Sequence, residues 1–361
     1  MSVSSKTKLF LSYLPLVRMY QQDISKSVDF QHIEEIIKRF ENPKNVDVSL
    51  PQPHIPIVGN AYDLANIKIA IYGMETRQWG DLVNVMKNDI RELIVSKDCD
   101  NWVNNLEYWN GRYNTFHAFV KRLLISLYDS EYEPETVARS IVYGQYYSYV
   151  RWEKIPFVEN EVIKGDDSVK MQEYYSQLKE ASNIFDGDSF QKINCLNPDI
   201  VLVLKWEPKM SFNGYELIKH YDHFKLFQSK DIEKRYILMI PHPRGFCSCK
   251  KNSEHFIQII KTELLNIYKK EDFKFESNQE TLSKQAFIGE LANYISTHDT
   301  QYKISHSDIQ MCLKYNGYLA DKGIEYGNNG AGIKNLLKSS CKYYHDNGDS
   351  DTENNIIRHL L

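Results

Sequence analysis

The sequence predicts an α/β fold in which a short parallel sheet is covered by helices on both faces, making three layers (α/β/α). Three short aliphatic segments indicate the strands: IKIAIY (67–72), DIVLVL (199–204) and RYILMI (235–240). Each is almost continuously apolar and ends at a glycine, a proline or a polar turn, as is typical of strands buried on both faces. Because helical periods lie between them, the strands are expected to be parallel.

The chain before the first strand is expected to form an N-terminal helical segment, residues 1–54. Five apolar residues recur there at helical spacing, and the pattern stops at ENPKN (41–45). These five are Phe30, Ile33, Ile36, Ile37 and Phe40. The following stretch, PQPHIPIVGN (51–60), is predicted to be extended because its prolines exclude a helix.

The α/β domain is predicted to span residues 55–275. Apolar stripes at helical spacing indicate helices in residues 116–127 and 250–270. The charged segment KKEDFKFESNQETLSK (269–284) is predicted to be a connector, with a domain boundary near residue 276. Residues 276–361 are then expected to form a small α-helical C-terminal domain.

Composition limits the classes of function. The chain has 361 residues, of which 42% are hydrophobic, and its net charge is -4. It can bury a sizeable core. It is not a polycation, so any binding of DNA must use a local basic surface. The 25 tyrosines suit stacking on nucleic acid and ordinary core packing equally well.

No cofactor, metal or membrane partner is expected. The six cysteines are scattered, and Cys247 with Cys249 alone cannot make a tetrahedral zinc site. Reduced thiols are typical of a cytoplasmic protein. The N-terminus lacks the apolar region and cleavage site of a signal peptide, and no segment reaches the ~20 apolar residues of a membrane span. We therefore expect a cytoplasmic protein and a monomer.

Ligands of parallel sheets bind at the carboxyl ends of the strands. The candidates are therefore the residues just after Tyr72, Leu204 and Ile240. At the first of these ends the chain reads GMETRQWG (73–80), in which Gly73 permits a tight turn. Glu75 is then expected to project into the crevice, where a carboxylate can orient and deprotonate a water molecule. A helix cap or an ion pair is the alternative role for this acid.

The second candidate segment is MIPHPRGF, residues 239–246. Two prolines stiffen the loop around His242, and a histidine held in this way can donate a hydrogen bond to a developing anion. Phe246 is expected at an exposed loop tip, where it could enter a base stack. The basic residues expected to meet phosphates are Arg244, Lys250 and Lys251. The alternative is a purely structural loop.

Together these segments resemble the two signature motifs of the uracil-DNA glycosylase superfamily. Gly-Met-x-x-x-x-aromatic-Gly (73–80) is closest to the single-strand-selective monofunctional branch, and His-Pro (242–243) matches the second motif. NPDIVLVL (197–204) resembles the family's penultimate core strand. The resemblance covers roughly residues 55–270 and implies a uracil-DNA glycosylase-like fold. It implies that Glu75 handles water and that His242 stabilises the leaving base.

The sequence departs from the family pattern at positions that read the base. Thr76 stands where the family commonly has proline, and Arg77 stands where relatives have the Tyr or Gly that screens the pyrimidine 5-carbon. The region matching the middle motif, YGQYYSYVRWEKI (143–155), offers no obvious base-reading Asn. The substrate-binding residues implied are Gly73, Met74, Arg77, Trp79, Tyr147 and Ser148. Plain uracil is therefore not the expected substrate; among relatives, phage-defence glycosylases that excise modified cytosines fit best.

A third segment, residues 304–344, resembles the small helix-turn-helix module at the end of many resolvase-like DNA-binding proteins. Its lysines outnumber its acids, and Lys334, Lys338 and Lys342 recur at four-residue spacing along one helical face. A basic stripe of this kind suits phosphates, although an ordinary solvated face has the same pattern. The glycine-rich NNGAG is too irregular to be a nucleotide-binding fingerprint.

The sequence thus predicts a monofunctional DNA glycosylase that flips out a modified pyrimidine, such as a modified cytosine of phage DNA, and leaves an abasic site. The predicted partner is DNA. One alternative is a non-catalytic sensor of modified DNA with the same fold, which retains such DNA without forming abasic product. A second alternative is a nucleoside or nucleotide hydrolase, which releases base from free nucleosides.

Overall fold

The computed structural model describes residues 3–12, 14, 56–75, 115–147, 193–206, 208–276, 282–298, 304–319 and 331–361. The chain divides into two compact units. We call residues 16–276 the sheet unit; residues 1–15 and 277–361 together form the helical unit. The predicted helix around residues 30–40 lies outside the described residues.

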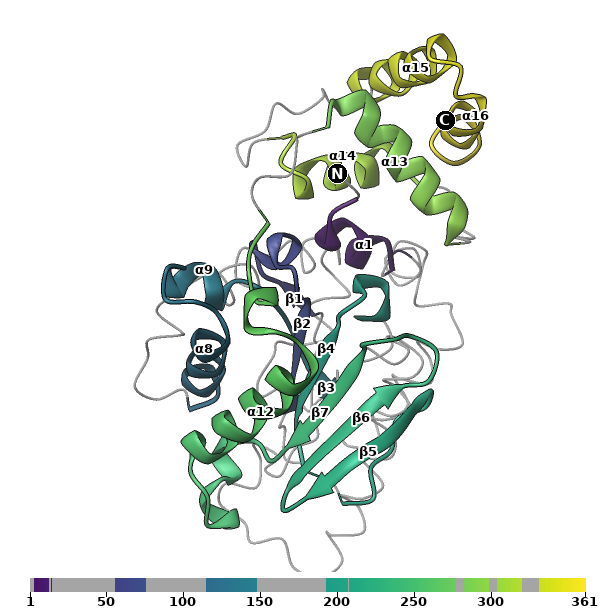
Figure 1. Ribbon diagram of the computed structural model, residues 1–361. Helices are drawn as coiled ribbons and strands as arrows, with labels where there is room; N and C mark the ends of the chain where they lie inside the picture. Colours follow the sequence, from purple (N-terminus) through teal and green to yellow (C-terminus); the bar gives the residue numbers. More distant parts are fainter. Residues whose placement is uncertain are drawn as a thin grey trace, which may run out of the picture. The chain divides into compact units, whose positions relative to one another are not determined.

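The sheet unit is built on a seven-stranded mixed sheet of order β1-β3-β2-β4-β7-β6-β5 (Figure 1). The strands are β1 (Ile57–Val58), β2 (Ile69–Glu75), β3 (Ile141–Tyr147), β4 (Ile200–Leu204), β5 (Tyr215–Tyr221), β6 (Phe224–Ser229) and β7 (Tyr236–Ile240). The adjacent strands β3, β2, β4 and β7 are parallel, whereas β1, β6 and β5 pair antiparallel at the two sides. The α/β class and the parallel pairing of β2, β4 and β7 are confirmed.

One face of this sheet is covered by two helices, α8 (Thr115–Leu127) and α12 (Ser253–Ile267). Their apolar stripes pack with Ile71, Leu202 and Leu238 in one continuous core. Side chains of the opposite face, such as Val203 and Met239, are also fully buried. This two-sided burial explains why the three predicted strands are continuously aliphatic. The second helical layer of the predicted three-layer arrangement remains a prediction.

The short elements of the sheet unit position its loops. They are α9 (Pro134–Ala138), η2 (Tyr62–Leu64), η4 (Ile193–Leu196), η5 (Pro243–Gly245), η6 (Cys247–Cys249) and η7 (Lys270–Asp272). Gly59, after β1, must be a glycine, because a Cβ there would lie 2.1 Å from the Arg139 carbonyl oxygen. The first part of the predicted connector packs on the sheet unit: Phe273 is buried, and Phe275 stacks on Tyr128 at 4.9 Å between ring centroids. The two units divide after Glu276, at the predicted boundary near residue 276.

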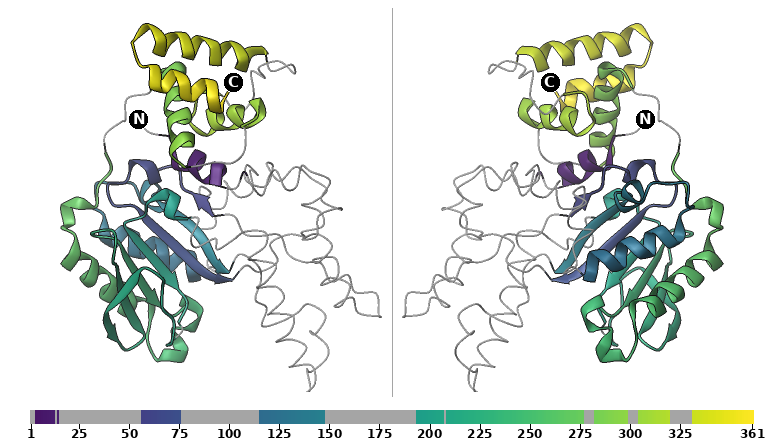
Figure 2. Two further views of the ribbon diagram at one scale, coloured as in Figure 1. Left: turned by 90° about the vertical axis from the view of Figure 1, so that its right-hand side faces the viewer. Right: turned by 90° about the vertical axis from the view of Figure 1, so that its left-hand side faces the viewer.

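The helical unit contains α1 (Ser5–Ser12), α13 (Lys284–Thr297), α14 (His306–Tyr315), α15 (Ala331–Asp346) and α16 (Ser350–His359) (Figure 2). α13 packs against α15 and α16. It approaches α15 closely because Gly289 has no side chain: a Cβ there would lie 2.2 Å from the hydroxyl of Tyr344.

The N-terminal helix α1 belongs to this helical unit. Asn316 at the end of α14 accepts a hydrogen bond from the Ser4 backbone N–H at 3.0 Å and donates to the Thr7 hydroxyl at 2.5 Å. Phe10 packs on Tyr315 with 5.8 Å between ring centroids. The start of the predicted N-terminal segment therefore packs with the C-terminal helices instead of standing apart.

The predicted helix-turn-helix falls on α14 and α15. Residues 320–330, between the two helices, lie outside the described residues. The helix-turn-helix therefore stays a prediction.

Candidate functional site

The carboxyl ends of the parallel strands provide the candidate site. Along the sheet, β3 lies on one side of β2, while β4 and β7 lie on the other. The chain order therefore reverses between β2 and β4, and ligands of open α/β sheets bind outside the strand ends at such a point. Glu75 is the last residue of β2, and His242 follows β7 by two residues.

The register aligns the strand residues that precede Glu75 and His242. Tyr72 pairs with Val203, and Val203 pairs with Met239. Glu75 and His242 each lie three residues beyond this row, on either side of β4. Since neighbouring strands lie about 4.8 Å apart, the two backbones are about 10 Å apart at the paired row.

The neighbouring strand β3 brings the region of the predicted middle motif to the same edge. Gly73 is buried and pairs with Gln145, and Glu75 pairs with Tyr147. Arg77, Trp79 and Ser148 lie outside the described residues, as do the side chains of Met74, Glu75 and Tyr147. The structure thus places the backbones of three of the predicted residues, Gly73, Glu75 and Tyr147, side by side.

His242 is held in one orientation. It caps η5, where its Nδ1 accepts a hydrogen bond from the Arg244 backbone N–H at 3.3 Å. An Nδ1 that accepts requires the neutral imidazole to carry its proton on Nε2. The ring also stacks on Phe116, at the start of α8, with 5.6 Å between centroids and 22° between planes. The arrangement provides an oriented Nε2–H donor.

The residue next to this stack, His117, is a buried histidine that stays neutral. Burial lowers the pKa of His117 from 6.5 to about 4. Its ring lies edge-on to Phe116 at 5.3 Å between centroids. Near neutral pH the His117 side chain, which lies next to the Phe116 ring that stacks on His242, therefore carries no charge.

Phe246 is not at an exposed loop tip, so that prediction is wrong. Its side chain is 2% exposed, and it stacks on Phe256 of α12 at 4.4 Å between ring centroids. It also meets Phe119 of α8 edge-on at 5.2 Å. The reason is hydrophobic: the loop after β7 crosses the two covering helices, and the aromatic ring enters their core. Phe246 anchors the loop that carries His242.

The basic residues of this loop differ in their surroundings. Arg244 and Lys250 are exposed, and Lys250 adopts a left-handed backbone conformation (φ 54°) at the end of η6. Lys251 is paired with Asp222, with 3.0 Å between Nζ and Oδ2. The hydrogen bond from Lys251, followed by that from His223, holds the pKa of Asp222 below its usual range. Two of the three predicted phosphate contacts are thus exposed cations.

The sequence analysis did not single out two features at this edge, Trp206 and the β5–β6 hairpin. Trp206 follows β4 by two residues, between the strands that carry Glu75 and His242. The β5–β6 hairpin turn brings His220 and His223 to the same edge, because β6 runs antiparallel to β7. The rule that points to residues after Leu204 identifies Trp206, but it gives no indication of the hairpin.

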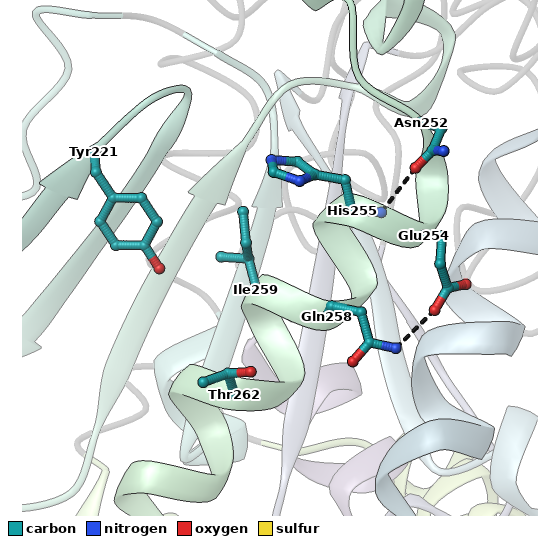
Figure 3. A pocket seen from close by; sticks show the side chains of 7 residues that line it. All are labelled: Tyr221, Asn252, Glu254, His255, Gln258, Ile259 and Thr262. Carbon is teal, nitrogen blue, oxygen red and sulfur yellow. Dashed lines mark hydrogen bonds between the residues drawn. The ribbon is translucent and has the colours of Figure 1, made fainter.

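A separate open pocket of about 420 Å³ lies beside α12 (Figure 3). Its lining residues are Tyr221, Asn252, Glu254, His255, Gln258, Ile259 and Thr262. Asn252 caps α12 by accepting from the His255 N–H at 2.9 Å, and Gln258 donates to Glu254 at 2.7 Å. None of the predicted site residues lines this pocket, so it does not bear on the proposed chemistry.

Within the helical unit, Lys334, Lys338 and Lys342 are exposed on α15. Tyr343 follows them with 44% of its surface exposed. The regular four-residue spacing therefore gives a basic stripe with an aromatic side chain at its end.

Three further observations concern metal sites, cysteines and membrane-spanning helices. Within the described residues, no group of three or more His, Cys, Asp or Glu side chains is placed to hold a metal ion. Cys247, Cys249, Cys312 and Cys341 lie outside any disulfide. Of the helices that the structure describes, none is both long and apolar enough to cross a membrane.

Comparison of the chain with protein-family models, with curated proteins and with solved structures gives no significant match. The function must therefore be argued from the site.

Proposed function

We propose that this protein is a monofunctional DNA glycosylase that hydrolyses the N-glycosidic bond of a modified pyrimidine and leaves an abasic site. The observation that carries the proposal is the register: Glu75 ends β2 and His242 follows β7 by two residues, each three residues beyond one paired row, with β4 between them. That spacing of about 10 Å suits two side chains that reach one nucleotide from opposite sides.

The proposed reaction begins when the target nucleotide leaves the base stack and enters the site. As the glycosidic bond breaks, positive charge develops on the sugar and negative charge on the base. The Glu75 carboxylate stabilises the sugar cation and deprotonates the water that attacks the anomeric carbon. His242 donates its Nε2–H to the oxygen of the departing base.

The geometry of His242 supports its part in this reaction. Because Nδ1 accepts from the Arg244 N–H, Nε2 is the ring nitrogen that can donate. The stack on Phe116 and the hydrogen bond from Arg244 fix the ring before substrate arrives. Such preorganised donors stabilise a developing oxyanion better than mobile ones do, because no reorganisation accompanies the reaction.

The test is base release from DNA. Purified protein is incubated with genomic DNA from phages that carry different cytosine modifications, and any freed base is identified by mass. An abasic-site nicking enzyme then reports the product in the DNA. Glu75→Gln is expected to lower the excision rate by about 10²- to 10⁴-fold while DNA binding persists.

The matched control is Glu216→Gln, the same chemical change on the exposed edge strand β5. It should leave excision unchanged. Full activity of Glu75→Gln would refute the mechanism. Retention of modified DNA by the wild-type protein, without base release on any substrate, would instead establish a non-catalytic sensor.

A further inference from the structure

Trp206 occupies the central position of the candidate site. It follows β4, the strand that separates β2 from β7. Its neighbour Lys205 is buried, whereas Trp206 itself is half-buried. An indole that remains partly exposed at the carboxyl end of a central strand offers a ring surface where ligands of such sheets bind.

Two imidazoles gather around this indole. The His223 ring centroid lies 5.3 Å from that of Trp206 at an angle of 47°, and the His220 centroid lies 6.1 Å away at 37°. Both histidines belong to the β5–β6 hairpin, and His220 is exposed. Both ring pairs are tilted, so neither imidazole stacks flat on the indole.

The surroundings of the cluster are positively charged. The Lys225 ammonium lies 5.6 Å from the centre of the Trp206 ring. It donates to the Pro208 carbonyl, and to the Met210 carbonyl at 3.4 Å, although its side chain is 97% buried by the fold. The nearby acid, Asp222, is paired with Lys251, and the His223 Nδ1 lies 2.8 Å from its carboxylate. An indole with a paired acid and a cation beside it suits a polyanion that carries aromatic bases.

From this cluster we infer that Trp206, flanked by His220 and His223, is a stacking platform for an unpaired nucleobase next to the target nucleotide. The inference rests on the proposed function and adds to it the form of the partner: DNA that is single-stranded at the site. A stacked base gains binding energy on the indole face regardless of its identity. The imidazole N–H groups then reach the phosphate beside it.

A purely structural role predicts a different outcome. If Trp206 only supports the hairpin through Lys225, its truncation lowers thermal stability and changes binding of single strands and duplexes equally. If it stacks a base, truncation selectively weakens single-strand binding. The two roles are therefore separated by comparing two DNA forms.

The experiment measures fluorescence anisotropy of a labelled single strand of roughly 12 nucleotides and of its duplex. All variants carry Glu75→Gln, so that binding is measured without turnover. Trp206→Ala should weaken single-strand binding by between about 5- and 150-fold, and duplex binding by less. Trp206→Phe should retain most of the affinity. The control Ile232→Ala, an exposed apolar residue in the β6–β7 turn, should change neither.

Wild-type single-strand affinity of a folded Trp206→Ala protein would overturn the inference. Should that variant fail to fold, His220→Ala/His223→Ala decides in the same assay: weaker single-strand binding supports the platform, and unchanged binding refutes it. Failure of the proposed function is distinguishable, because it appears as an absence of abasic product from the wild-type protein whatever these affinities are.

Discussion

The sheet unit and the helical unit present their polar side chains in opposite ways. In the sheet unit, parallel strands end together, so the backbones of Glu75, Trp206 and His242 lie at one edge although they are far apart in sequence. In the helical unit, Lys334, Lys338 and Lys342 lie along one helix at regular spacing. The first arrangement concentrates unlike groups around one small volume, and the second distributes like charges over a length.

The first arrangement suits catalysis, and the second suits binding of a long polyanion. A bond is broken by groups that converge on it within hydrogen-bond reach, whereas a polyanion is held by cations spaced along its backbone. We therefore expect changes in the sheet unit to alter rate and changes on α15 to alter binding. Two of the three predictions below test this division directly, and the other concerns the stability of the sheet unit.

The largest effect is expected from His242→Ala. Loss of the Nε2–H donor should lower the excision rate by about 10²- to 10³-fold, because the departing base loses its oxyanion stabilisation. The affinity for DNA should change little. Single-turnover release of base from modified DNA measures the rate. The control is His255→Ala in the first turn of α12, a histidine that is not among the predicted site residues; equal losses in both variants would contradict the role of His242.

An intermediate effect is expected from acid. Because the pKa of His117 is about 4 in the folded protein and 6.5 in the unfolded chain, the unfolded state binds the extra proton between these values. Stability is therefore lost as the pH falls from 6.5 towards 4, by about 3 kcal/mol in total. Urea unfolding of the sheet unit at several pH values measures this slope.

His117→Asn should flatten that slope, since asparagine does not titrate. The control Ile125→Ala, at an exposed position on the same helix, should keep the wild-type slope. An unchanged slope in His117→Asn would assign the acid sensitivity to other groups.

The smallest effect is expected from the basic stripe on α15. Changing Lys334, Lys338 and Lys342 together to Gln should weaken DNA binding by about 10-fold and reduce its salt dependence by a slope of about 2. The single-turnover rate at saturating protein should not change. The control removes equal charge from three exposed lysines of the sheet unit, Lys230, Lys234 and Lys274. Equal losses in both triple variants would show that α15 has no special part in binding.

The strands most evident in the sequence are those whose two faces are both buried. The segments that form β2, β4 and β7 are almost continuously apolar, so these three strands and their parallel pairing could be predicted. β5 could not, because its side chains are exposed on both faces: Leu217 is 50% exposed and its neighbour Ile218 is 40% exposed. A strand at the side of a sheet that buries neither face has no burial pattern to recognise.

The candidate site could be predicted where residues directly follow a buried parallel strand, because ligands bind at the carboxyl ends of such strands. The strand-end rule points to Glu75 and His242, and the structure places the ends of their strands at one edge of the sheet; their roles stay predictions. It could not give the burial of Phe246, because an aromatic residue in a polar loop has the same sequence signature whether it faces solvent or enters a core. The hairpin that brings His220 and His223 to Trp206 depends on antiparallel pairing between segments that show no shared pattern.

The packing of α1 on α14 makes the helical unit discontinuous in sequence. The Ser4–Asn316 hydrogen bond spans 312 positions along the chain. During synthesis α1 therefore emerges before the sheet unit, and its partner α14 emerges after it. The helical unit can thus assemble only after the residues of the sheet unit have been made, so a cotranslational folding order follows from the connectivity of the chain.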